Sequence, residues 1–255
     1  MCTGYSPIVA RSGRPLIAPV FLSGDRPNGA KPMSVGTGFA GKMSSVIGGL
    51  KAIDRTQYTL APAEPGSVDT IPLMVGACLA NAVATRMQTV TFGAGAMAAR
   101  SELFERDTSG RGADDFDLVL IDAAGAPVAS SASFGSDEAI ALAAPPAGAY
   151  HLCTIAYGTA GGQPSTYGLD VVIVNTSDKG GNLRAAVPAT VYAGGTATVP
   201  VSWSGPASGK RFLGAVRLLN NKGAIGATTV VQVETNALLP RGERAQRDKF
   251  KNGKR

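Results

Sequence analysis

The sequence predicts an all-β protein built from two β-sandwich modules, a jelly-roll-like one and a smaller immunoglobulin-like one. Between residues 87 and 176, short apolar runs recur about every ten residues and are separated by Gly or Pro, a spacing typical of sandwiches. The 255-residue chain holds 33 glycines and 16 prolines, and only 16% of it is charged. This turn-rich, charge-poor composition favours β structure over helical bundles and coiled coils.

The first 86 residues carry weaker signals. Residues 1–32 are rich in Pro, Gly and Arg and show no sustained period, so we expect an irregular lead-in. Residues 33–86 combine two expected strands, near PMSVGT and TQYTLA, with a segment at 63–86 whose first half is loop-like. The second half of that segment, LMVGACLANAVATRM, has enough Ala, Leu and Met for a helical turn or two.

The first sandwich is expected at residues 87–178. Seven or eight apolar runs in this segment match a small two-sheet sandwich of the jelly-roll type. We place these strands near residues 87–95, 99–106, 116–123, 126–132, 138–143, 149–157 and 166–175.

Residues 179–236 supply immunoglobulin-like strands. About five strands fit between residues 183 and 235, fewer than a free-standing immunoglobulin-like sandwich needs. The shortage is resolved if residues 33–62 complete this second sandwich and the first one is inserted between its strands. Trp203 alternates in phase with Val199 and Val201, so we expect it to anchor the second core.

The charge distribution argues against a nucleic-acid partner. The chain carries a formal net charge of +6 and has a pI near 9.4, but the excess is concentrated in residues 237–255, where seven Lys or Arg accompany two acidic residues. A basic tail with a single aromatic residue is typical of a disordered, solvated end. The rest of the chain is nearly neutral, so we expect no nucleic acid to bind it.

The cysteines and the apolar segments leave the compartment open. Cys2, Cys78 and Cys153 have no metal-ligand spacing. Cys78 and Cys153 either pair in a disulfide or stay apart, with Cys153 as a small buried hydrophobe, and we favour the second. Residues 71–84 form an apolar run too short to span a bilayer. We expect no export signal in residues 1–24, whose short apolar patches are interrupted by prolines.

Several motifs in residues 107–157 resemble a known family. Residues 114–118 read DDFDL before a strand that ends in the turn DAAG, residues 136–138 read SDE, and residues 146–150 read PAGAY. This order is similar to the pre-peptidase C-terminal β-sandwich that follows the catalytic domain of secreted bacterial subtilisin-like serine peptidases. The resemblance covers residues 87–235, with a lead-in from residue 33. It implies an extracellular location and a loop at residues 63–86.

A catalytic site is not expected in this chain. A subtilisin-like site needs a Ser, a His and an Asp on separate segments, and the only histidine, His151, lies inside a predicted strand, where we expect it to be half-buried. No serine stands in a nucleophile elbow. The chain is therefore predicted not to be an enzyme, although its family is associated with peptidases.

A P-loop nucleotide hydrolase is the strongest enzymatic rival. Gly36, Gly41 and Lys42 give the frame G-x-x-x-x-G-K, and LVLID offers a strand that ends in an acid. However, Met43 stands where a P-loop needs Ser or Thr to reach Mg²⁺. The residues after Lys42 are also poor helix formers, so a nucleotide hydrolase stays a remote alternative.

The acidic residues before and within the LVLID strand are the candidate site. Carboxylates crowded at one end of a sandwich are hard oxygen ligands of the kind that Ca²⁺ selects, which predicts a structural Ca²⁺ site formed by Asp107, Asp114, Asp115 and Asp117. The alternative is a solvated turn paired with Arg106 and Arg111. Seven of the chain's 18 acidic residues lie in this stretch: Glu102, Glu105, Asp107, Asp114, Asp115, Asp117 and Asp122.

The resemblance and the missing catalytic residues lead to one functional prediction. We expect a non-catalytic accessory region that serves stabilisation, secretion or attachment to a surface or substrate. Its partner would be a peptidase catalytic domain or an extracellular protein or glycan surface. The alternative is a free-standing extracellular module that binds protein or glycan.

Overall fold

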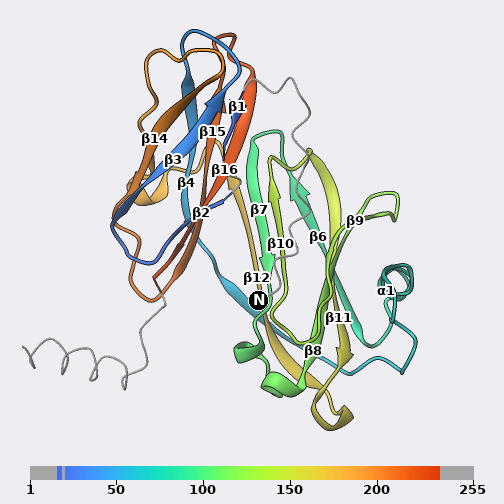
Figure 1. Cartoon of the computed structure of the whole chain (residues 1–255). Coiled ribbons are helices and arrows are strands. Elements are labelled where there is room, and N and C mark those ends of the chain that lie inside the picture. The colour runs from blue at the N-terminus through green and yellow to red at the C-terminus, as the bar shows by residue number, and fades with distance from the viewer. Residues whose placement is uncertain (1–15, 19–20, 236–255) are drawn as a thin grey trace, which may run out of the picture. The chain divides into compact units, whose positions relative to one another are not determined.

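The computed structural model describes residues 16–18 and 21–235, so the basic tail at 237–255 and most of the expected lead-in lie outside the described residues. The fold is all-β, and its strands form four four-stranded sheets. The chain divides into two compact units (Figure 1). One unit is Ile53–Ser177, and the other joins the described parts of Pro15–Ala52 and Asp178–Arg255. The first unit is thus inserted into the sequence of the second.

The inserted unit is a jelly roll. Its sheets have the strand orders β10-β7-β12-β5 and β6-β11-β8-β9, and successive strands cross between sheets everywhere except at the β8–β9 hairpin, as in a double-sheet jelly roll. The bounds are β5 (Arg55–Leu60), β6 (Thr85–Phe92), β7 (Ala96–Glu102), β8 (Asp115–Asp122), β9 (Pro127–Ser131), β10 (Ala139–Ala143), β11 (Gly148–Gly158) and β12 (Ser165–Asn175).

The jelly-roll core lies between its two sheets. Phe116, Leu118 and Leu120 alternate along β8 and meet Leu152 and Tyr167 from β11 and β12. This alternation is the period-two pattern that a half-buried strand requires. Short 3₁₀ turns shape the loops at η1 (Glu105–Asp107), η2 (Arg111–Ala113) and η3 (Ala160–Gly162).

The outer unit is immunoglobulin-like. Its sheets have the orders β1-β3-β14-β13 and β2-β16-β15-β4, the arrangement of an immunoglobulin sandwich whose first strand switches sheets. Only β2 and β16 pair in parallel among the described strands. The elements are β1 (Leu16–Ile17), β2 (Phe21–Gly24), β3 (Gly29–Thr37), β4 (Ser44–Ala52), η4 (Gly180–Asn182), β13 (Arg184–Ala185), β14 (Gly195–Trp203), β15 (Arg211–Leu219) and β16 (Ile225–Glu234).

Trp203 is a core residue of the outer unit, as its phase with Val199 and Val201 predicts. Its indole Nε1 donates to the Arg26 carbonyl oxygen at 3.0 Å. A Cβ added at Gly29 would collide with the indole ring. The glycine therefore leaves the space that the tryptophan fills.

Two expectations about strand placement need correction. The expected irregular segment 1–32 contains β1, β2 and the start of β3, because Leu16 and Leu22 are buried in the outer core. The strand expected near TQYTLA does not join the outer unit. It forms β5, which pairs with β12 of the jelly roll from Ser165 opposite Leu60 to Asp170 opposite Arg55.

The segment expected to be a loop at 63–86 contains a helix, α1 (Ile71–Leu79). The Thr70 hydroxyl accepts from the Leu73 backbone N–H at 3.5 Å as an N-cap. Met74 and Cys78 are buried against the outer face of β8 and β11. The helix covers Val119 and Ile121 on that face, which explains why the part of β8 from residue 118 to residue 121 is continuously apolar.

Cys78 of α1 and Cys153 of β11 form a disulfide, with their Cα atoms 6.2 Å apart. The preference for a separate, buried Cys153 thiol is therefore wrong. Both cysteines are fully buried, so Cys153 is as apolar in its surroundings as expected. The bond links the helix to the sheet that it covers.

The glycine-rich motif at residues 36–42 has no phosphate-binding geometry. Gly41 forms an isolated bridge with Val191, and the chain continues into strand β4. A P-loop instead opens a helix, whose N-terminus binds the phosphate. Within the described residues, no helix has the length and apolar character needed to cross a membrane.

Candidate functional site

The loops at one end of the jelly roll form a pocket of about 790 Å³, within the size range of ligand sites. It lies where β7 enters the β7–β8 loop and where β10 begins. The walls carry guanidinium and carboxylate groups together. They are lined by Arg100, Glu102, Leu103, Phe104, Glu105, Arg106, Arg111, Asp137, Glu138 and Ala139.

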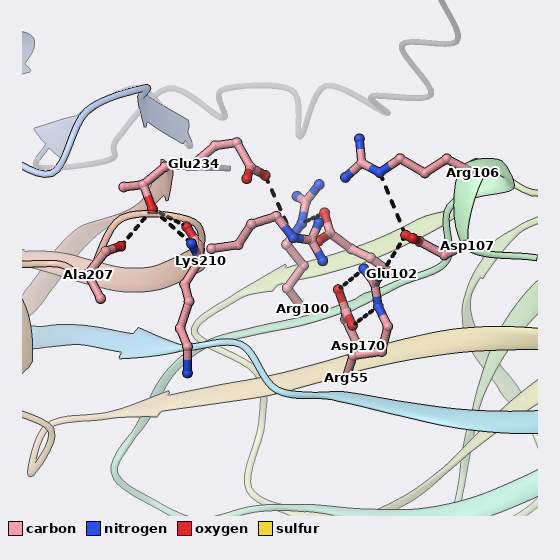
Figure 2. A network of polar contacts seen from close by, with 11 residues as sticks. Arg55, Arg100, Glu102, Arg106, Asp107, Asp170, Ala207, Lys210 and Glu234 are labelled. Atoms are coloured by element: carbon pink, nitrogen blue, oxygen red, sulfur yellow. Dashed lines mark hydrogen bonds and ion pairs between the residues drawn. The ribbon is translucent and has the colours of Figure 1, made fainter. Parts of the chain in front are cut away.

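A chain of ion pairs holds Arg106 at this pocket (Figure 2). Arg55 donates to both carboxylate oxygens of Asp170, at 3.0 and 3.1 Å, and its Nη1 lies 2.7 Å from Asp107 Oδ2. The same Asp107 oxygen lies 3.6 Å from Arg106 Nε. The Arg106 guanidinium also stacks 4.5 Å from the centre of the Phe104 ring. These contacts limit the positions that Arg106 can take.

Asp114 fixes the loop that carries Arg111. Its carboxylate is buried and accepts hydrogen bonds from the backbone N–H groups of Gly110, at 2.8 Å, and Ala160, at 2.9 Å, and from the Ser165 hydroxyl. Burial raises the pKa of this carboxyl, but the hydrogen bonds outweigh burial and the pKa lies below its usual value. Arg111 has φ +49°, a conformation that a non-glycine residue adopts only when its surroundings impose it.

The Glu138 carboxylate anchors the loop between β9 and β10. The side chain is buried and accepts from the Ser133 backbone N–H at 2.7 Å. The hydroxyls of Ser131 and Ser133 also donate to it. One buried carboxylate thus binds one donor from the end of β9 and two from the loop, which fixes the loop's shape.

Side chains of the β9–β10 loop also attach it to the β7–β8 loop. The Ser136 hydroxyl donates to the Asp114 carbonyl oxygen at 2.8 Å and accepts from the Phe116 N–H at 3.1 Å. Asp137 Oδ1 accepts from the Glu105 N–H at 2.9 Å. Both loops line the pocket, so its walls are cross-linked by hydrogen bonds.

Asp115 and Asp117 project from the other face of β8, away from Phe116 and the jelly-roll core. Asp117 is only 3% exposed, and burial raises its pKa to about 8, with further contributions from the Asp115 and Glu138 carboxylates. Burial also raises the pKa of Asp115. Neither residue forms an ion pair with a described basic residue.

The structure does not bring the four predicted calcium ligands together. Asp107 pairs with arginines, Asp114 is saturated by backbone and hydroxyl donors, and Asp115 and Asp117 share the opposite face of the strand. Across residues 16–18 and 21–235, no three His, Cys, Asp or Glu side chains are grouped so as to hold a metal ion. The residues present therefore do not fit the predicted ion as one ligand set.

Sequence reasoning missed several residues of this end of the jelly roll. Arg55 and Asp170 lie on β5 and β12 and meet only through strand pairing. Ser165 reaches Asp114 across 51 positions. Local spacing contains no signal for such contacts. Glu138, by contrast, belongs to the SDE step that carried the family resemblance.

His151 is half-buried on β11, as expected, opposite Thr89 of β6 and Ile121 of β8. Its outward neighbours on the strand belong to the apolar cluster under α1. Within the described residues no hydrogen bond or ion pair holds its ring. Nothing at this position resembles an oriented catalytic base.

Comparisons with known proteins do not assign the chain to a family. No family model matches it, and no curated protein matches it. The propeptide form of a Bacillus licheniformis lipase, BlEst2, is 11% identical over 58% of this chain and 38% of its own, with a TM-score of 0.26. The M60 catalytic domain with CBM51 domains of Clostridium perfringens ZmpB is 8% identical, over 59% of this chain and 18% of its own, with a TM-score of 0.25.

A viral protein shows a similar degree of likeness. VP2 of infectious bursal disease virus, in a subviral particle, is 13% identical over 82% of this chain and 48% of its own, with a TM-score of 0.29. The present chain thus spans less than half the length of each of these three structures. Likeness of this extent assigns neither a family nor an activity, and the chain is placed only by its fold, as an all-β protein of two sandwiches.

Proposed function

We propose that this chain is a non-catalytic accessory region of a secreted protein and that its jelly roll attaches that protein to an extracellular glycan. The accessory role follows the sequence resemblance to the C-terminal extensions of subtilisin-like peptidases. The Cys78–Cys153 disulfide supports an oxidising compartment. The free-standing binding module predicted as the alternative would use the same pocket.

The observation that carries the proposal is the combination of unpaired charges of both signs in one rigid pocket. No hydrogen bond or ion pair joins the Glu105 carboxylate or the Arg111 guanidinium to another described side chain. Planar groups of this kind bind neighbouring hydroxyls, since the carboxylate accepts and the guanidinium donates. A polyhydroxylated ligand satisfies both groups without carrying a net charge.

The chemistry of the walls disfavours other small ligands. Three of the ten lining residues are apolar, whereas sites for apolar small molecules are lined mainly by hydrophobic and aromatic groups. A simple anion would meet the carboxylates of Glu105 and Asp137, and a simple cation would meet Arg106 and Arg111. A chain of sugar rings fits the polarity and the volume together.

The test is retention of the purified chain by insoluble polysaccharides. Cellulose, chitin and xylan are incubated with wild type, Glu105→Gln, Arg111→Gln and the control Lys222→Ala, which changes an exposed turn of the outer unit. We expect at least one polymer to retain wild type and the control, and each pocket variant to bind about tenfold more weakly, the effect of losing a charge-assisted hydrogen bond. Retention of no polymer, or equal retention of all four proteins, would overturn the proposal.

The non-catalytic part of the proposal has its own assay. Purified chain is incubated with fluorescent casein, with a subtilisin as the positive control. We expect no release of fluorescent peptides, because within the described residues no hydrogen bond or ion pair orients His151, the only histidine, as a Ser-His-Asp set requires. Release that survives repeated purification would contradict a non-catalytic role.

A further inference from the structure

Phe134 is the most exposed large apolar residue among those described, at 99%. It stands in the loop between β9 and β10, in the sequence Ser133-Phe134-Gly135. A single exposed apolar side chain is common on protein surfaces. The β9–β10 loop that carries Phe134 differs from a mobile surface loop because hydrogen bonds anchor it at several points.

The loop presents Phe134 on a fixed backbone. The preceding residue, Ser133, donates through both its N–H and its hydroxyl to the buried Glu138 carboxylate. The following residue, Gly135, has φ +93°, which L side chains rarely adopt. Ser136 is fully buried and hydrogen-bonded to the β7–β8 loop. The phenyl ring is therefore exposed without the entropy of a mobile loop, which lowers the cost of ordering it on a ligand.

The loop that carries Phe134 also borders the pocket. A Cβ placed on Gly135 would be 3.8 Å from Glu105 Oε2, one of the unpaired groups of the pocket wall. Asp137, Glu138 and Ala139 of the same loop line the pocket. The residue that follows Phe134 thus lies beside the carboxylate that is free to bind hydroxyls.

We propose that Phe134 is the stacking platform of the glycan site, on which the C–H face of a pyranose ring packs while the ring's hydroxyls bind Glu105 and Arg111. This inference rests on the proposed function and adds the class of ligand: a neutral pyranose polymer with an accessible apolar face. An aromatic face carries negative charge density that attracts polarised C–H groups. Acidic sugars would place a carboxylate near Glu105 and Asp137, which repel it.

A protein partner suits this surface less well. The central part of a protein–protein interface is apolar and continuous, and the β9–β10 loop offers one aromatic ring beside charged walls. The other exposed large hydrophobic residues of the jelly roll lie on other elements, at α1 and after it, on β9 and on β11: Leu73, Leu79, Val83, Val128 and Tyr157. A sugar ring needs only one platform and a few polar groups.

The experiment uses the full chain and two substitutions at this position. Phe134→Ala removes the platform, and Phe134→Trp replaces it with a fluorescent one. The matched control is Tyr192→Ala, an aromatic residue of the outer unit that is 74% exposed. The probe is the hexasaccharide of the polymer that retains wild type: cellohexaose, chitohexaose or xylohexaose. Binding is measured by calorimetry and by tryptophan emission.

Three results are expected together. Phe134→Ala weakens binding about tenfold or more, while Tyr192→Ala leaves it unchanged. Phe134→Trp keeps the affinity, and its emission shifts to shorter wavelength on saturation. The native Trp203 is only 4% exposed, so it contributes little to that shift. All variants keep the wild-type melting temperature, since the ring packs against nothing.

The failure modes are distinguishable. If no polysaccharide retains wild type, the proposed function fails and takes this inference with it. If wild type binds a hexasaccharide and Phe134→Ala binds it equally well, the glycan function stands and the platform is wrong. Absence of an emission shift in a Phe134→Trp variant that binds also overturns the platform.

Discussion

At the scale of single residues, Asp114 is the clearest case of a charge used for structure. Its carboxylate accepts from Gly110, Ala160 and Ser165 and so ties two loops together. We expect Asp114→Asn to lose about 2–3 kcal/mol of unfolding free energy, because an amide nitrogen cannot accept from these donors. Urea denaturation measures the loss, and Asp25→Asn at an exposed site of the outer unit is the control.

The pKa of Asp114 adds a pH dependence to this prediction. A carboxyl whose pKa is lower in the folded state stabilises the protein above its unfolded pKa, and the stabilisation is lost as the pH falls towards the folded pKa. The difference between wild type and Asp114→Asn should therefore narrow in acid. A gap that stays constant down to about pH 2 would contradict this role of the carboxylate.

The pKa of Asp117 is shifted in the opposite direction to that of Asp114. Burial and the neighbouring carboxylates raise its pKa to about 8, whereas the unfolded chain releases this proton near pH 4. The unfolding free energy therefore falls as the pH rises between these two values, and this group adds no further loss above its folded pKa. Asp117→Asn should reduce this fall of the unfolding free energy with pH. At about pH 8.5 the variant should be more stable than wild type by on the order of a few kcal/mol.

Melting curves recorded from acid to alkaline pH check the Asp117 prediction. The wild type and Asp117→Asn should converge at about pH 4, where an unperturbed Asp is half-protonated, and diverge as the pH rises. Asp25→Asn again serves as the control for the loss of one surface charge. Parallel curves for wild type and Asp117→Asn would show that the buried carboxyl titrates normally.

Residue-level prediction from the sequence succeeded in part. Glu102 and Glu105 of the acidic stretch line the pocket, whereas Asp122 lies at the other end of β8. The partner of each acidic residue was not predictable, since Asp107 meets Arg55 and Asp114 meets Ser165 only after distant strands pair. Composition identifies a charged end, whereas tertiary contacts decide which charges remain free.

At the scale of elements, α1 depends on the sheet that it covers. The helix is short, and isolated helices of this length are marginal in water. Its buried residues and the Cys78–Cys153 disulfide attach it to β8 and β11. The sequence signals were divided between loop and helix because the stabilising partner lies some seventy-five positions away.

Removing the disulfide tests this dependence. The double variant Cys78→Ala, Cys153→Ala should lose about 2–4 kcal/mol, the usual effect of a cross-link that closes a long loop. Guanidinium denaturation under non-reducing conditions gives the difference, and addition of dithiothreitol to wild type should reproduce it. If reduction leaves the wild-type midpoint unchanged, the bond adds no stability.

At the scale of the whole molecule, the jelly roll is an insertion between β4 and β13. The Gly49 N–H donates to the Asp178 carbonyl oxygen at 2.7 Å, so the chain leaves and re-enters the outer unit at neighbouring points. We expect that a short Gly-Ser turn can replace residues 54–177 and leave the outer sandwich folded. Emission from Trp203, which belongs to that unit, reports its cooperative unfolding.

The matched control for that deletion is a variant in which the same turn also replaces β13. That variant removes a strand of the sandwich and should not fold. An unfolded deletion variant that keeps β13 would mean that the outer unit requires the insertion.

The all-β class and the two sandwiches were predicted from composition and strand spacing, and the structure confirms them. The insertion was inferred from the number of expected strands, because residues 183–235 hold too few for a sandwich. Strand β5 was assigned to the wrong unit, since an alternating strand carries no mark of the sheet that it will join. Local patterns define strands, whereas their partners are fixed by the whole fold.

The hydrogen bond between Gly49 and Asp178 also bears on the order of folding during synthesis. Strands β2, β3 and β4 are made long before β13 to β16, with which they pair. An unfolded insertion would impose the closure entropy of a very long loop on that pairing, whereas a folded jelly roll reduces the loop to its two short connections. We therefore expect the inner module to fold first, while the edges of the outer strands remain unpaired. Slow-folding jelly-roll variants should aggregate through the outer unit, whose own sequence is unchanged.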